Sequence, residues 1–259
     1  MNCCERPKLS DLKLTCRDPS VFHRTQWSKL PAVVFIAYRV VLALYILGFY
    51  IALVVEGQSN GGYNLIFLTN VAFIVFVVYL LVSGLVAVTD GCILRKRNNE
   101  EMGIRHVIHW LLFNVTINAN FIISIIYWAV LYNSARSGFF YNFHVHAVTS
   151  IVSMIDLIVT AIPVRLFHGI YPVVFLCTYT VVTLIYWATG NGTVYPFLDY
   201  DNNPGLAAGA IVGIFVAVWA MQGFMWAIYK LRMWFWIKCE GQDSILQPDQ
   251  EQDRHEEGL

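Results

Sequence analysis

Six long apolar runs, separated by short polar connections, dominate the sequence. Each run is close to the length of about 20 mostly apolar residues that an α-helix needs to cross a bilayer. None alternates between apolar and polar positions as a half-buried strand does, so each is interpreted as a membrane-spanning helix. The six predicted spans are residues 30–55, 63–89, 106–132, 144–163, 166–189 and 205–231.

The composition agrees with a membrane protein. The chain has 259 residues, of which 58% are hydrophobic and 13% are charged, whereas soluble domains carry roughly 25% charged residues. Its net charge of zero gives no reason to expect a nucleic-acid partner. We therefore predict an all-α membrane domain over residues 30–231, between an N-terminal tail (1–29) and an acidic C-terminal tail (232–259) that we expect to be disordered.

Lys and Arg gather in alternate connections, which predicts an orientation. Residues 1–29 carry six of them, and Arg95, Lys96 and Arg97 follow the second span. The connections on the other side contain only Arg136. The positive-inside rule then makes both termini cytosolic, which requires an even number of spans. Asn191 opens an Asn-Gly-Thr glycosylation triplet, and this triplet falls in the last outer connection.

Two opposite charges lie inside predicted spans. At a rise of 1.5 Å per residue, Arg39 lies about 13 Å and Asp156 about 10 Å from the cytosolic ends of their helices. An unpaired charge at such a depth is costly. We therefore predict that Arg39 and Asp156 form an architectural ion pair.

Histidines at the cytosolic ends offer a second chemistry. His106 and His109 are three residues apart on one helix face, and His168 opens the fifth span on the same side. With Asp156 they have the composition of a zinc site in an intramembrane hydrolase. We favour interfacial histidines without a metal, because the positions are terminal and no supporting pattern surrounds them. No metal or other cofactor is predicted.

Small and amide side chains within the spans predict helix packing. Asn114 and Asn118 are four residues apart, with Asn120 nearby, and are expected to hydrogen-bond between helices. The small-residue face formed by Gly205, Gly209 and Gly213 suits close packing within the chain, and by itself it does not indicate a homo-oligomer.

A hydroxyl and two histidines enter from the outer side. Thr69 lies six residues into the second span, about 10 Å below the interface, and His146 lies nearer that interface in the fourth span. The two could act as nucleophile and base, but the residues alone favour packing, with Thr69 bonded back to the carbonyl of Leu65. His144 and His146 point about 200° apart on an α-helix, so at most one is expected to face the interior. No carboxylate shares their depth, so any catalytic unit would be a dyad.

Three stretches carry a family resemblance, which spans about residues 27–236. They are "YNLIFLTNVAF", "NFHVHAVTSIVSMIDLIVTAIPVRLFHGIYPVVF" and "IYWATGNGTVYPFLDYDNNPG". They resemble the rolling stone family of insect and other invertebrate membrane proteins, most specifically at 163–172 and 195–199. The member that names the family is associated with myoblast fusion. The resemblance thus implies one function, a non-enzymatic role in cell fusion or adhesion through exposed outer residues 134–142 and 195–203.

More distantly, the chain resembles the androgen-induced membrane hydrolases, which cleave fatty acid esters of hydroxy fatty acids with an intramembrane Thr and a His. "FLT", ending at Thr69, and the Asn142-x-x-x-His146 spacing match those motifs. Phe143 and Ala147 stand where those enzymes have His and Thr. The resemblance implies a Thr69–His146 dyad acting on a lipid ester from the outer leaflet of the plasma membrane or the endoplasmic reticulum. It leaves the identity of the ester open.

Overall fold

The structure is a computed structural model that describes residues 7–59, 65–93, 102–132 and 139–239. Within these ranges the regular structure is helical, and the only pairing of extended backbone is an isolated bridge between Thr25 and Thr160. Six helical segments are long and apolar enough to cross a membrane. The predicted all-α class with six spans is therefore confirmed.

The spans are built from α-helices that continue into short π-helical or 3-10 segments. The α-helices are α1 (Ala32–Ser59), α2 (Leu68–Val88), α3 (Ile104–Ile126), α4 (Phe139–Asn142), α5 (Thr149–Val159), α6 (Ile170–Tyr186) and α7 (Pro204–Cys239). The π-helical segments are η3 (Thr89–Ile93), η4 (Tyr127–Leu131), η5 (Phe143–Val148) and η7 (Trp187–Asn191). The 3-10 segments are η1 (Leu9–Leu12), η2 (Pro19–Phe22), η6 (Leu166–Gly169) and η8 (Pro196–Leu198).

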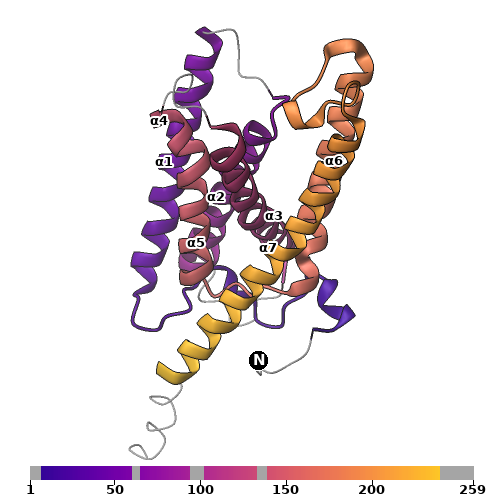
Figure 1. The fold of residues 1–259 in the computed structure, drawn as a ribbon. Helices are drawn as coiled ribbons and strands as arrows, with labels where there is room; N and C mark the ends of the chain where they lie inside the picture. The colour runs from indigo at the N-terminus through magenta and orange to yellow at the C-terminus, as the bar shows by residue number, and fades with distance from the viewer. Residues whose placement is uncertain (1–6, 60–64, 94–101, 133–138, 240–259) are drawn as a thin grey trace, which may run out of the picture.

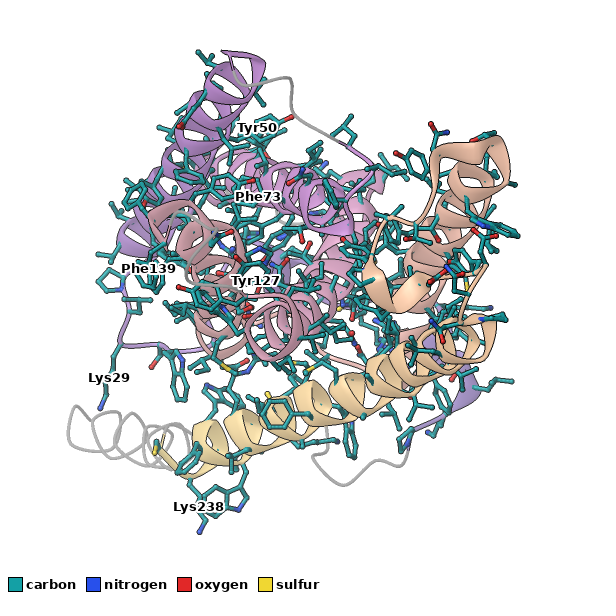
Figure 2. All side chains as sticks on the ribbon, turned by 45° about the horizontal axis from the view of Figure 1, so that its top comes forward. Lys29, Tyr50, Phe73, Tyr127, Phe139 and Lys238 are labelled. Carbon is teal, nitrogen blue, oxygen red and sulfur yellow. The ribbon has the colours of Figure 1, made fainter. Side chains whose placement is uncertain are left out.

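Helices α2 and α3 form the centre of the bundle. Figure 1 shows α1, α4 and α5 on one side of them and α6 on the other, while α7 crosses the bundle obliquely. Phe76, Trp110 and Phe113 are fully buried where these helices meet. Figure 2 shows Phe73 and Tyr127 inside the bundle, with Lys29 and Lys238 at its edge. Large apolar side chains also cover the outside, as expected of surfaces that face lipid.

Several helix boundaries differ from the predicted ones, among them the start of the fourth span, which lies at Phe139 rather than at residue 144. Helix α2 begins at Leu68 rather than at residue 63, so Thr69 is the second residue of its helix and lies nearer the helix end than predicted. The fourth span ends at Val159, where Thr160 turns into extended backbone. The approach of Pro163 explains this early end, because the residues before a proline disfavour helical backbone. Helix α7 continues eight residues past 231, to Cys239.

The N-terminal segment packs against the bundle. Phe22 is 1% exposed and its ring stacks on that of His106, with 5.4 Å between centroids. Arg165 Nη1 donates to the carbonyl of Lys13 at 2.7 Å. Residues 7–31 thus close the end of the bundle where both described termini lie (Figure 1), which we call the terminal end. The opposite end, where α2 begins, is called the pocket end.

Several residues used for the orientation lie outside the described ranges. They include Arg95, Lys96, Arg97 and Arg136, and the same holds for residues 240–259 of the predicted C-terminal tail. The described termini share one end of the bundle, as an even number of spans requires. The cytosolic placement of that end stays a prediction.

Candidate functional site

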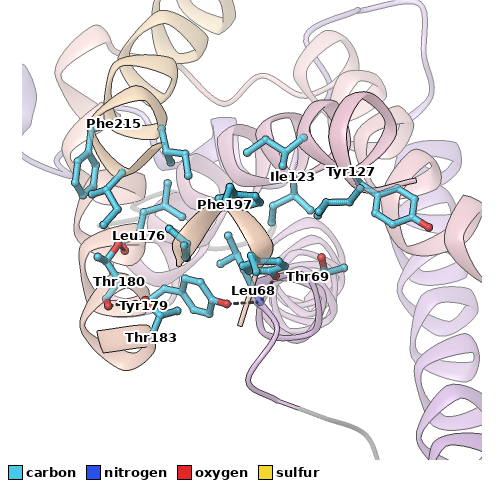
Figure 3. Close-up of a pocket in the computed structure, with 16 residues that line it drawn as sticks. Leu68, Thr69, Ile123, Tyr127, Leu176, Tyr179, Thr180, Thr183, Phe197 and Phe215 are labelled. Carbon is cyan, nitrogen blue, oxygen red and sulfur yellow. Dashed lines mark hydrogen bonds between the residues drawn. The ribbon is translucent and has the colours of Figure 1, made fainter. Parts of the chain in front are cut away.

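A cavity of about 60 Å³ opens at the pocket end, between the start of α2, the end of α3, α6 and α7. Most of its walls are apolar, and they include Ile123, Leu176, Ile214 and Phe215. Thr69 lines the same cavity (Figure 3). Apolar walls with a small number of polar groups are the usual composition of a small-molecule pocket.

The hydroxyl of Thr69 differs from those of the other two pocket threonines. Thr180 Oγ1 donates to the carbonyl of Leu176 at 2.9 Å, and Thr183 Oγ1 donates to that of Thr180 at 2.8 Å. In the part of the chain that the structure describes, no such bond joins Thr69 to Leu65, because α2 has not yet begun there. The Thr69 hydroxyl is therefore not bonded back to its own helix, and it hydrogen-bonds to Tyr195 at the cavity instead.

Two tyrosines hold the start of α2 beside Thr69. The backbone N–H of Leu68 donates to the hydroxyls of Tyr179 and Tyr195, at 3.0 and 3.1 Å, and Tyr179 donates onward to the carbonyl of Ile66 at 2.8 Å. Burial raises the pKa of Tyr195, against the opposing effect of hydrogen bonds from Tyr179, Leu68 and Thr69. Tyr195 is therefore a neutral hydroxyl at physiological pH, in contact with Thr69.

His146 lies behind the pocket wall. Its side chain is 4% exposed, and its ring stacks on Tyr127 with 3.5 Å between centroids and 5° between planes. Tyr127 also lines the cavity, and Figure 3 shows its ring directed away from the other lining residues. Among the described residues, His146 Nδ1 has no hydrogen-bond partner, and no hydrogen bond joins His146 to Thr69. Thr69 and His146, the predicted dyad, thus lie on the two sides of Tyr127 and do not contact each other.

His144 is buried as well, so the expectation that at most one of the two histidines faces the interior is wrong. His144 packs against Phe49 of α1, and His146 packs against Tyr127 at the end of the third span, so each histidine is covered by a different neighbour. His144 Nδ1 donates to the carbonyl of Phe140 at 2.9 Å, and Nε2 accepts from the hydroxyl of Tyr45 at 2.8 Å. With both nitrogens bonded and its ring stacked on Phe49, His144 is a packing residue.

Arg39 and Asp156 meet in the interior. Arg39 Nη1 lies 2.7 Å from Asp156 Oδ2, and the two side chains are 1% and 0% exposed. The hydroxyls of Tyr38 and Tyr79 also donate to the carboxylate, each at 2.6 Å. Three donors from α1 and α2 thus converge on one carboxylate of α5, which ties the three helices together.

The candidate zinc ligands at the terminal end do not converge. His106 Nε2 lies 2.7 Å from Asp90 Oδ2, and its Nδ1 accepts from the N–H of Gly103 at 3.0 Å. His109 and His168 pack against the rings of Tyr79 and Trp110 instead. Within the described ranges, no group of three or more His, Cys, Asp or Glu side chains is placed to hold a metal ion. The geometry therefore gives the metal-hydrolase alternative no support.

Asp90 is a site residue that sequence reasoning missed. It is fully buried, and Arg105 bonds to it through Nε and Nη2, both at 3.0 Å. Together with His106 this makes a three-residue polar cluster that joins the end of the second span to the start of the third. The sequence signal that could have revealed Asp90 is a carboxylate placed directly before a connection rich in Lys and Arg.

The predicted amide contacts are present in part. Asn118 Nδ2 donates to the carbonyl of Val218 on α7 at 3.1 Å, and Asn120 Nδ2 donates to Ser153 Oγ on α5 at 3.0 Å. Among the described residues, Asn114 bonds within its own helix alone, to the carbonyl of Trp110 at 2.7 Å. The glycine face is not used for packing within the described chain, since a Cβ added at Gly205, Gly209 or Gly213 would meet no atom within 4 Å. Asn191 is exposed at the end of η7.

The bundle with its buried ion pair is that of a multi-span integral membrane protein. The family described as Protein rolling stone matches residues 9–240, so the chain belongs to the rolling stone family. A curated relative, Protein rolling stone of Drosophila melanogaster, is 29% identical over 233 residues, covering 83% of this chain and 84% of the relative. No solved structure matches the chain.

Proposed function

We propose that this rolling stone family protein hydrolyses fatty-acyl esters of membrane lipids, with Thr69 as nucleophile and His146 as general base. The observation that carries the proposal is the Thr69 hydroxyl, which faces an apolar cavity without a bond to its own helix. The resemblance of "FLT" and Asn142-x-x-x-His146 to the androgen-induced hydrolases points the same way.

The walls of the cavity suit an acyl chain. Ile123, Leu176, Ile214 and Phe215 offer methyl, methylene and ring contacts, and a buried methylene contributes about 0.8 kcal/mol of binding. An ester carbonyl at the mouth of this surface would lie beside Thr69, the position that acyl transfer requires.

The reaction divides into two acyl transfers. His146 takes the Thr69 proton as Thr69 Oγ1 attacks the carbonyl carbon, and the tetrahedral intermediate then expels the alcohol, which leaves with the proton from His146. Water, deprotonated by His146, next attacks the acyl-Thr69 ester. The carboxylic acid leaves, and the proton returns to Thr69. The net change is ester plus water to acid plus alcohol.

Before catalysis the imidazole has to pass its stacking partner. Tyr127 stacks on His146 and also lines the cavity, so the proposal requires this ring to shift and His146 to approach Thr69. His146 Nδ1 has no partner among the described residues, so it accepts a proton without breaking an existing bond. Catalytic hydrogen bonds that are long without substrate often shorten in the complex.

The test is hydrolysis of a branched fatty-acyl ester by purified protein in nanodiscs. Thr69→Ser is expected to retain activity, because it keeps the hydroxyl. Thr69→Ala should abolish it, and His146→Ala should lower kcat by about 10²–10⁴-fold. Thr178→Ala is the matched control, because Thr178 is an exposed threonine of α6, bonded to the carbonyl of Val174 and outside the cavity; it should match wild type.

Equal background hydrolysis by all these proteins would return Thr69 to a packing role. The non-enzymatic alternative, cell fusion or adhesion through the outer connections, would then be favoured. Activity that a chelator removes would instead support the metal-dependent alternative.

A further inference from the structure

The connection between α6 and α7 covers the cavity at the pocket end. Tyr195, Phe197 and Leu198 all come from this connection and all line the cavity, and we call these three residues the cover. Figure 3 shows Phe197 with Leu176 on one side and Ile123 on the other. The Tyr195 and Phe197 rings stack on each other, with 5.2 Å between centroids and 4° between planes. The two rings of the cover therefore form one packed unit.

A single hydroxyl fastens the cover to α2. In the described part of the chain, the polar contacts between the cover and α2 meet at the Tyr195 hydroxyl, which accepts from the N–H of Leu68 at 3.1 Å and is also hydrogen-bonded to Thr69. Farther along the connection, Tyr200 bonds to Thr183 of α6 at 3.1 Å, and Trp187 of η7 donates to Asp201 at 3.0 Å. These bonds hold the far half of the connection and do not involve the cover.

Release of that hydroxyl would leave the N–H of Leu68 paired. The N–H of Leu68 is shared with Tyr179, whose hydroxyl lies 3.0 Å away and stays on the body of α6. The start of α2 therefore keeps its hydrogen bond when Tyr195 leaves. This redundancy makes opening inexpensive, because an unpaired buried N–H is the larger part of the cost of losing such a bond.

We infer that Tyr195 is the latch of the lipid pocket: its hydroxyl holds the cover closed against the start of α2, and an acyl chain reaches Thr69 when the hydroxyl lets go. The nature of the ligand rests on the proposed function, but the latch rests on the contacts alone. Tyr195 is thus a positioning residue that controls access to Thr69.

Access is measured with a cysteine inside the pocket. Ile123 is 8% exposed and lines the cavity from α3, which contains no native cysteine. The rate at which a membrane-permeable maleimide labels Ile123→Cys, read by peptide mass spectrometry, reports how often the cover opens. Adding Tyr195→Phe removes the latch but keeps the ring, and should raise this rate about fivefold, equivalent to about 1 kcal/mol. Ile214→Cys, on the α7 wall, provides a second reporter.

Tyr200→Phe is the matched control, since it removes a hydroxyl from the same connection without touching α2. It should leave the labelling rate unchanged. For ester hydrolysis, Tyr195→Phe should raise kcat/KM by a similar factor with kcat unchanged. A labelling rate unaffected by Tyr195→Phe, or raised equally by Tyr200→Phe, would overturn the latch.

The same experiments separate the latch from the proposed function. Faster labelling of Tyr195→Phe in a protein without esterase activity would leave the latch in place and remove the hydrolase. Thr69-dependent hydrolysis with unchanged labelling would do the reverse.

Discussion

Replacing Asp156 by Asn tests whether the interior of the bundle depends on one carboxylate. The substitution keeps the shape of the side chain and removes its charge. Arg39 would remain 1% exposed with its ionic partner gone. Its Nε and Nη2 already lack hydrogen-bond partners among the described residues, so neighbouring groups offer no replacement.

The expected loss is large. Removing one partner of a buried ion pair costs about 3–5 kcal/mol. Since 1 kcal/mol shifts the midpoint of a chain of this size by about 2–4 °C, Asp156→Asn should lower Tm by about 6–20 °C. Tyr38→Phe removes only one of the hydrogen bonds to the carboxylate, so its effect should be about 1.5–3 kcal/mol.

Thermal unfolding of purified protein in one detergent is the assay. The double variant Arg39→Met with Asp156→Leu removes both charges, and should be closer to wild type than Asp156→Asn is, because no unpaired charge remains. The reasoning would be refuted by an Asp156→Asn protein whose Tm stays within about 2 °C of wild type. The single variants Arg39→Met and Asp156→Leu are measured in the same assay. If their losses of stability simply add in the double variant, the reasoning is refuted as well.

Three further predictions concern orientation and helix contacts. In microsomes, Asn191 should receive a glycan that Asn191→Gln abolishes; an unmodified wild type would contradict the outer placement. Arg232→Met should lower the free energy of unfolding by at least about 3 kcal/mol, and Tm with it, because Arg232 donates to the carbonyls of Leu157, Thr160 and Ile162 at the end of α5. An unchanged Tm would contradict a stabilising role for these three bonds. In the same assay, Asn120→Leu should destabilise more than Asn114→Leu, by about 1 kcal/mol, since only Asn120 bonds to another helix. Equal losses would contradict that contrast.

The features that depend on length and depth could be predicted from the sequence. A run of apolar residues long enough to cross a bilayer marks a span wherever it occurs. Arg39 and Asp156 could be matched because each position, counted from a helix end, gives a depth, and opposite charges at one depth have few other partners. Both inferences need only the rise per residue and no knowledge of which helices are neighbours.

Features that depend on rotation and on neighbouring helices could not be predicted. His144 and His146 lie in a π-helical segment wedged between other helices, and periodicity does not show which helix each histidine faces. Thr69 was predicted six residues into its helix but is the second residue of α2, because the apolar run begins before the helix does. The outer stretch that begins at Tyr195 suggested an exposed surface, yet Tyr195 and Leu198 line the pocket. Phe22, in a polar segment, gave no signal of its burial among histidines.

The central claim is that Thr69 carries the acyl group during lipid ester hydrolysis. The most direct measurement is mass spectrometry of the protein, quenched in acid during turnover of a branched fatty-acyl ester. The account predicts the mass of the acyl group on the peptide that contains Thr69, and its absence in Thr69→Ala. Turnover with no acyl adduct on Thr69, or with the adduct on another residue, would contradict it.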